Sequence, residues 1–138
     1  RSIFKIVDLD EAWAFLNVAQ GETLSNKLVR AGRAMNAGVY FVTQSSGDVS
    51  KESLKNNIGL KFAFRSTDTN EIKQTLEFFG LDSEDENNQK RLRDLENGQC
   101  LMQDLYGRVG VVQIHPVFVE LLHAFDTRPP IKSEVDLE

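Results

Sequence analysis

Hydrophobic positions in the first part of the chain gather in two short, nearly unbroken runs. The first run opens with Ile3 and Phe4 and continues to Leu9, and the second covers residues 39–43. Apolar runs of this length are typical of parallel strands that are buried on both faces. The pattern therefore predicts two buried strands near the start of the chain.

Between the two runs, residues 22–35 have the spacing of an amphipathic helix. Apolar side chains recur there at i, i+4, i+7 and i+11, namely at Leu24, Leu28, Ala31 and Met35. The Asn-Ala-Gly sequence at residues 36–38 is a stop signal. At 100° per residue, Arg30 and Arg33 lie about 60° apart and away from the apolar stripe. We expect both arginines to point outward.

The rest of the chain has the pattern of a scaffold of strands and helices. Asp68 with Glu71 and Ser83 with Glu86 have the spacing of capping boxes, which mark helix starts. The elements expected there are, in order, a strand at 61–65, helices at 68–80 and 83–97, a hairpin of 99–104 and 108–114 around Tyr106-Gly107, and an apolar stretch at 117–125.

The first apolar run ends abruptly in two adjacent carboxylates, Asp10 and Glu11. Ligands of parallel sheets gather where the strands end, so both acids are expected at a nucleotide-binding edge. One carboxylate of such a pair holds the water shell of Mg²⁺, and its neighbour positions or deprotonates the water that attacks the γ-phosphate. The alternative is an ordinary strand end before a helix, where acids favour the helix dipole. Gln44, after the second run, adds an amide suited to sensing the γ-phosphate.

In the order of its motifs, the chain resembles the motor ATPases of the HerA–FtsK superfamily of RecA-like folds. More narrowly, it is similar to the conjugation ATPase of type IV secretion systems, in the branch carried by conjugative transposons and plasmids. The resemblance covers residues 3–129 and rests on Val-Asp-Leu-Asp-Glu-Ala-Trp at 7–13, Arg-Ala-Gly-Arg-Ala-Met-Asn-Ala-Gly at 30–38, and Phe-Val-Thr-Gln-Ser at 41–45.

The resemblance implies roles for four residues. Asp10 matches the acid that is associated with Mg²⁺ through water, and Glu11 matches the catalytic glutamate. Arg33 matches the arginine that is presented to the nucleotide of a neighbouring subunit, and Gln44 matches the sensor glutamine. The expected catalytic residues are thus Glu11, Arg33 and Gln44, and the expected contacts to ATP and Mg²⁺ are Asp10, Glu11 and Gln44.

Other residues have open or plainer interpretations. Ala34 stands where relatives often carry a second basic residue, which leaves open whether Arg30 shares the role of the arginine finger. Arg65 is a further candidate for facing the nucleotide, although a surface position is favoured. Trp13 is expected to be an anchor in the core or at an interface rather than a platform on which a base stacks.

One missing motif shapes the expected domain organisation. No Gly-x-x-x-x-Gly-Lys-Ser/Thr sequence occurs, so the chain lacks the backbone cradle and lysine that hold the β- and γ-phosphates. Residues 1–126 are therefore expected to be the C-terminal half of a RecA-like P-loop NTPase domain, from the Walker B strand onward. Its expected fold is α/β, a mainly parallel sheet with flanking helices and a terminal β-hairpin. Residues 127–138 are expected to be a disordered tail that ends in a cloning scar, Leu137-Glu138.

Composition narrows the function classes. One cysteine and two histidines exclude a disulfide framework and disfavour a metal cluster held by the protein. A net charge of −5 argues against a general nucleic-acid-binding surface, because phosphate contacts dominate such affinity. No run is long and apolar enough for a membrane span. We expect a cytoplasmic location, peripheral at the inner face of the bacterial membrane through partners.

The resemblance implies that the full-length protein is a hexameric ATP-hydrolysing motor. Such a motor energises assembly of, or transport through, a conjugative type IV secretion channel for DNA transfer. Its expected partners are ATP, further copies of itself and other channel proteins, and this fragment alone is expected to be inactive. Two alternatives stay open: a DNA-translocating motor of the coupling-protein type, and a RecA-like docking module that hydrolyses no nucleotide.

Overall fold

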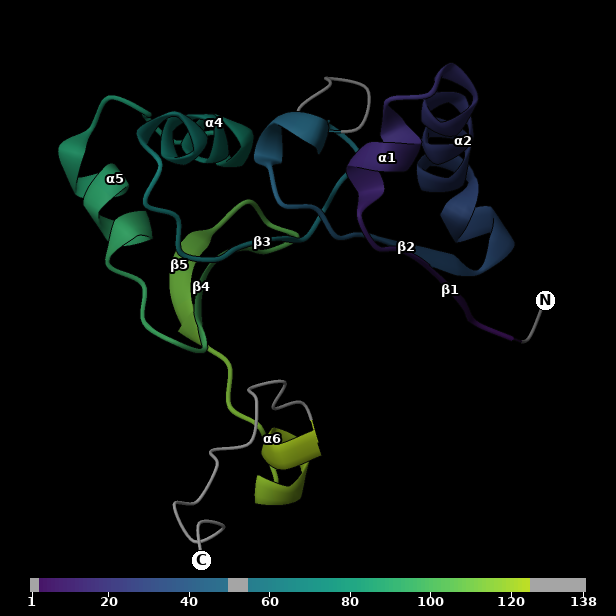
Figure 1. Ribbon diagram of the computed structural model, residues 1–138. Coiled ribbons are helices and arrows are strands. Elements are labelled where there is room, and N and C mark those ends of the chain that lie inside the picture. The colour runs from purple at the N-terminus through teal and green to yellow at the C-terminus, as the bar shows by residue number, and fades with distance from the viewer. Residues whose placement is uncertain (1–2, 50–54, 125–138) are drawn as a thin grey trace, which may run out of the picture.

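The computed structural model describes residues 3–49 and 55–124 of the 138-residue chain, which form an α/β fold (Figure 1). The expected tail at residues 127–138 lies outside the described residues. The helices and strands are, in chain order, β1 (Lys5–Leu9), α1 (Ala12–Leu16), α2 (Ala19–Met35), β2 (Ala37–Phe41), the 3₁₀ helix η1 (Ser46–Val49), β3 (Lys61–Ala63), α4 (Thr69–Phe79), α5 (Glu86–Arg93), β4 (Gln99–Gln103), β5 (Val109–Gln113) and α6 (Val119–Ala124).

The described strands form two sheets. β1 and β2 pair in parallel, with Leu9 opposite Phe41 at their carboxyl ends. α2 connects them, and a helical crossover of this kind is what parallel neighbours need. β3, β4 and β5 form a separate antiparallel sheet in that order. The expected terminal hairpin is confirmed, because β4 pairs with β5 from Gln99 opposite Gln113 to Gln103 opposite Val109.

The prediction of a mainly parallel sheet is wrong for the described strands, because parallel pairing is confined to β1 and β2. The prediction that these two strands are buried is also wrong, because neither contains a buried residue. The chain passes through two helices, α4 and α5, between β3 and β4. β4 runs antiparallel to β3, with Phe62 opposite Met102.

Helix α2 begins at Ala19, earlier than its apolar pattern predicts. Gly21 is buried in its first turn, where a Cβ atom would lie 1.9 Å from the carbonyl oxygen of Phe15 in α1. The close approach of α1 and α2 therefore requires glycine at this position, which sequence reasoning had placed in a connecting segment. The helix ends as predicted, with Asn36 in the left-handed region at a φ of 53°.

Only one of the two capping-box patterns identifies the residue that caps its helix. Asp68 caps α4, because its Oδ1 atom accepts a hydrogen bond from the Glu71 backbone N–H at 2.8 Å. The second pattern identifies the wrong cap: Asp85, rather than Ser83, accepts from the Asn87 backbone N–H at 2.8 Å and begins α5. Both helices are thus predicted correctly in kind, although the second, expected at 83–97, begins at Glu86 and ends at Arg93.

One hydrophobic core joins the two sheets. Its buried side chains are Ala12, Leu16, Val49, Ile72, Leu76, Phe78, Phe79, Leu92, Leu95 and Leu101. α1, which follows the carboxyl end of β1, therefore packs into the same cluster as α4 and α5. Leu24 of α2 was expected in the core but is 48% exposed. Leu9 at the end of β1 and Val29 of α2 are partly buried and pack against this core.

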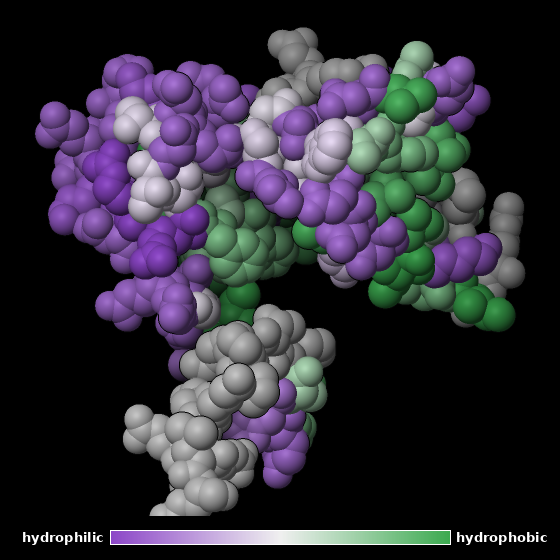
Figure 2. Space-filling model, in the orientation of Figure 1, coloured by the Kyte–Doolittle hydropathy of each residue, from purple (hydrophilic) through white to green (hydrophobic). Residues whose placement is uncertain are grey.

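Apolar surface remains uncovered around the parallel pair. Phe4, Ile6, Tyr40 and Val42 are each at least half exposed and, by the register of β1 and β2, project from one face of this sheet. Figure 2 shows hydrophobic surface gathered over the part of the molecule that contains β1, β2, α1 and α2. α6 stands apart from both sheets, with none of its residues buried (Figure 1). Among the described residues, no helix combines the length and apolar character needed to cross a membrane.

Candidate functional site

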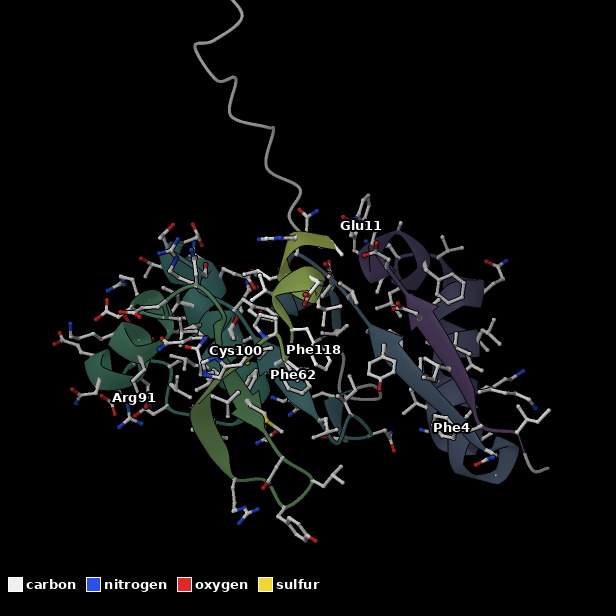
Figure 3. All side chains as sticks on the ribbon, turned by 90° about the horizontal axis from the view of Figure 1, so that it is seen from below. Phe4, Glu11, Phe62, Arg91, Cys100 and Phe118 are labelled. Carbon is white, nitrogen blue, oxygen red and sulfur yellow. The ribbon has the colours of Figure 1, made fainter. Side chains whose placement is uncertain are left out.

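The carboxyl ends of β1 and β2 bring two expected site residues together. Backbone pairing continues past the ends of β1 and β2, since the Ala12 backbone N–H donates to the Val42 carbonyl oxygen at 2.9 Å. Gln44 Nε2 then donates to Glu11 Oε1 at 2.7 Å, although the two residues are 33 positions apart in the sequence. Glu11 lies at the opposite end of β1 from Phe4 (Figure 3). Sequence reasoning thus correctly predicted that this carboxylate and this amide share one edge of the sheet.

Asp10 lies beside this pair. Its Oδ1 atom accepts from the Glu11 backbone N–H at 3.0 Å, and its side chain is exposed. Within residues 3–49 and 55–124, no group of three or more His, Cys, Asp and Glu side chains is placed to hold a metal ion. Mg²⁺ in nucleotide sites keeps several waters and needs only one or two carboxylates beside phosphate oxygens. An exposed Asp10 fits a Mg²⁺ ion that is bound together with nucleotide.

Glu11 has a backbone conformation that L-residues rarely adopt. Its φ of 51° and ψ of 47° are left-handed values, and its side chain makes no capping hydrogen bond to α1. For a residue such as glutamate this conformation costs about 1–2 kcal/mol, whereas Asn36, at a φ of 53°, is of a type that tolerates it. The carboxylate therefore caps no backbone N–H of α1. The alternative of an ordinary acid that favours the helix dipole stays open for Glu11.

Trp13 holds the other oxygen of the same carboxylate. Its indole Nε1–H donates to Glu11 Oε2 at 2.7 Å, and its side chain is 46% exposed. Trp13 was expected to be an anchor in the core or at an interface; the core position is wrong, and the interface position stays a prediction. Sequence reasoning missed the contact, although the i, i+2 spacing within the Asp-Glu-Ala-Trp motif was the available signal. Trp13 and Gln44 each donate a hydrogen bond to one oxygen of Glu11, which gives the carboxylate a defined orientation.

The backbone of Arg33 lies away from this edge. Arg33 belongs to the last turn of α2, and its side chain lies outside what the structure describes. Asn36, just beyond α2, accepts through its carbonyl oxygen from Lys5 N at the start of β1, at 2.9 Å. β1 has five residues and is therefore about 16 Å long, at about 3.3 Å per residue. This length separates that end of the sheet from Glu11. The two remaining candidates are exposed, namely Arg30 and Arg65.

The loop after β2 is anchored by a residue that sequence reasoning assigned to helix capping. Glu71, in the first turn of α4, accepts hydrogen bonds from Ser45 Oγ at 2.8 Å, from Ser46 N at 2.7 Å and from Ser46 Oγ at 2.9 Å. Its capping-box spacing had indicated a bond back to the backbone of its own helix. Gln44 immediately precedes the anchored serines, so the loop that carries the amide is attached to α4.

These hydrogen bonds set the ionisation of Glu71. Partial burial raises its pKa, but the backbone N–H of Ser46 and the hydroxyls of Ser45, Ser46 and Thr75 together outweigh burial and lower the pKa below the ordinary value. The four donors all favour the charged carboxylate. Glu71 therefore remains ionised at pH values at which an exposed glutamate takes up a proton.

A pH-dependent contribution to stability follows from this lowered pKa. The contribution of the Glu71 charge is fully present above the ordinary glutamate pKa of about 4.3 and is lost as the pH falls through the lower pKa of the folded state. We expect Glu71→Gln to reduce the free energy of unfolding at pH 7, and this difference from the unsubstituted chain to shrink as the pH is lowered below about 4. Urea unfolding of both chains at several pH values measures it, with Glu77→Gln on the exposed part of α4 as the control. A difference that stays constant down to pH 3 would contradict the assignment.

Comparison with known proteins adds two findings. The sequence pattern of a family described as the AAA-like domain matches residues 1–125. The chain is also 34% identical over 119 residues to an uncharacterized protein named YddE from Bacillus subtilis (strain 168). The aligned segment covers 86% of this chain but only 14% of that relative.

Proposed function

Because this chain belongs to the AAA-like domain family, we propose that the edge after β1 and β2 is part of an ATP-hydrolysis site in a larger protein. Domains of this family are ATPase domains typical of conjugation ATPases, which implies that the complete protein uses nucleotide and Mg²⁺. The observation that carries the proposal is the 2.7 Å hydrogen bond from Gln44 Nε2 to Glu11 Oε1. It joins a carboxylate and an amide at the strand edge where parallel sheets bind ligands.

The proposed roles follow from the chemistry of each side chain. Glu11 accepts a proton from the attacking water, because each of its oxygens has a further lone pair beyond the bonds from Gln44 and Trp13. In the proposal, Gln44 exchanges its contact with Glu11 for one with the γ-phosphate. Asp10 binds the water shell of Mg²⁺, which when bound neutralises charge on the phosphates.

Tight nucleotide binding requires residues outside this chain. The sequence holds no P-loop, and thus no lysine and backbone cradle for the β- and γ-phosphates. The aligned relative is much longer than this chain, which covers 14% of it. In the proposal, another part of the complete protein supplies the phosphate cradle, and residues 1–126 supply the Walker B acids and the sensor.

The 138-residue chain by itself is therefore expected to bind Mg·ATP weakly and to hydrolyse none. Isothermal titration of the chain with Mg·ATP measures this, with the complete protein titrated in parallel as the control. We expect binding by the complete protein and little or no heat from the chain. A dissociation constant in the low micromolar range for the chain alone, about −8 kcal/mol, would contradict the half-site proposal.

At the level of the whole protein, we propose a hexameric motor that energises a conjugative type IV secretion system. The motif order and the family membership support this proposal. Its partners are ATP, further copies of the protein and other proteins of the secretion channel, which would hold it at the inner face of the membrane. ATP hydrolysis by the complete protein, together with loss of DNA transfer when Glu11 is replaced, tests it.

Two other functions would give different results when ATP hydrolysis by the complete protein is measured. A DNA-translocating motor of the coupling-protein type would hydrolyse ATP faster when DNA is added. The net charge of −5 gives little support for DNA contact by this chain. A docking module would hydrolyse no ATP in any form, and the strained, doubly hydrogen-bonded Glu11 supports hydrolysis over docking.

A further inference from the structure

Gln44 lies in the loop between β2 and η1. Two sets of hydrogen bonds hold this part of the chain. Thr43 Oγ1 donates to Asp48 Oδ2 in η1. Glu71 of α4 receives the second set from Ser45 and Ser46. Gln44 lies between residues that are fixed on either side, while its own side chain is exposed at the strand edge.

We propose that Glu71 is a positioning residue for ATP hydrolysis, which holds the loop so that the amide of Gln44 meets Glu11. This inference rests on the proposed function. Glu71 lies in α4, and within the described residues its carboxylate accepts hydrogen bonds from Ser45, Ser46 and Thr75 rather than from Gln44. It acts on the reaction through the loop alone.

The arrangement of hydrogen-bond donors around Glu71 indicates a specific contact between α4 and the loop. Its Oε1 atom accepts from Ser46 N, from Ser46 Oγ at 2.9 Å and from Thr75 Oγ1 at 3.4 Å, and its Oε2 atom accepts from Ser45 Oγ. Asp68 meanwhile accepts the Glu71 backbone N–H, so the helix start is capped without the Glu71 carboxylate. The carboxylate is thereby available for the loop. Its position in the first turn also favours a negative charge through the helix dipole.

The two oxygens of Glu71 differ in what they require. Oε1 accepts a backbone N–H, which only an acceptor can receive. Oε2 accepts from the hydroxyl of Ser45, which is able to reverse its role and accept from an amide. Glutamine therefore satisfies every partner of Glu71 in one orientation, whereas alanine satisfies none. This difference makes Glu71→Gln the conservative variant and Glu71→Ala the disruptive one.

Steady-state ATP hydrolysis by the complete protein tests the inference in a double-mutant cycle. We expect Glu71→Ala to lower kcat by about 10- to 100-fold, since a misplacement of about 1 Å at a catalytic group has an effect of that size. KM for ATP should stay nearly unchanged, because in the proposed function the loop contacts the reacting phosphate and not the rest of the nucleotide. Glu71→Gln should retain most of the activity. Glu77→Ala, an exposed position of the same helix, is the matched control.

The cycle is closed with Gln44→Ala and the combination of Gln44→Ala and Glu71→Ala. If Glu71 acts through Gln44, the double variant has the kcat of Gln44→Ala alone. Losses that multiply, or a Glu71→Ala variant with the kcat of the unsubstituted protein, overturn the inference. A complete protein that hydrolyses no ATP, or a Glu11→Gln variant that hydrolyses it normally, overturns the proposed function instead. Thermal unfolding of each variant separates a positioning effect from loss of folded protein.

Discussion

Replacing Glu11 by glutamine in the complete protein is expected to abolish ATP turnover and to preserve ATP binding. The amide has nearly the shape of the carboxylate but cannot accept a proton from water. Loss of a positioned general base typically reduces the rate by about 10²–10⁴-fold. Glu11 is exposed, so the substitution places no polar group in the core and the fold should be retained. Phosphate release and equilibrium binding of ATP, each measured with the complete protein, give the two readouts.

Asp8 provides the matched control for Glu11→Gln. It lies two positions earlier, is exposed on β1 and is likewise a carboxylate. Asp8→Asn removes the same charge at almost the same place, and we expect it to leave turnover nearly unchanged. Turnover by Glu11→Gln at the rate of the unsubstituted protein would mean that the Walker B assignment is wrong. A matching loss in both variants would assign the effect to charge rather than to proton transfer.

The second large effect is expected for Arg33→Ala. An arginine finger stabilises charge on the transferring phosphoryl group and contributes about 10³- to 10⁵-fold to the rate in other systems. Arg33 lies in the last turn of α2, at the end of the sheet where β1 begins, whereas Glu11 follows the other end. A length of about 16 Å for β1 places the backbone of Arg33 far from the Glu11 of its own chain. We therefore expect Arg33 to serve a neighbouring subunit.

Mixing two inactive variants tests this action between subunits. Arg33→Ala alone should abolish hydrolysis by the complete protein, with ATP affinity and folding nearly unchanged. Mixed with Glu11→Gln, it should regain some activity, because mixed rings contain interfaces at which an intact Glu11 meets an intact Arg33. Lys27→Ala on the same helix is the control, and Arg30→Ala shows whether a second arginine shares the role. If mixing restores nothing while Arg33→Ala alone remains active, Arg33 is a surface residue.

Local patterns in the sequence sufficed for the elements that carry the site. Apolar runs predict β1 and β2, and the carboxylates and amide that follow them lie at one edge because parallel strands end together. Asp68 marks the start of α4, and Tyr106-Gly107 marks the hairpin, since caps and turns depend on residues within a few positions. These features depend on short-range backbone geometry, which neighbouring residues determine.

Only the tertiary structure decided which partners meet across long separations. The antiparallel pairing of β3 with β4 joins residues that are far apart in the sequence, such as Phe62 and Met102. Glu71 has the spacing of a capping residue and yet binds Ser46, 25 positions away, because folding of the core brings α4 to the loop. Gly21 lies within a helix because α1 packs against it at a distance that no side chain permits. Such contacts depend on how the elements pack, and the spacing of residues along the chain does not specify this packing.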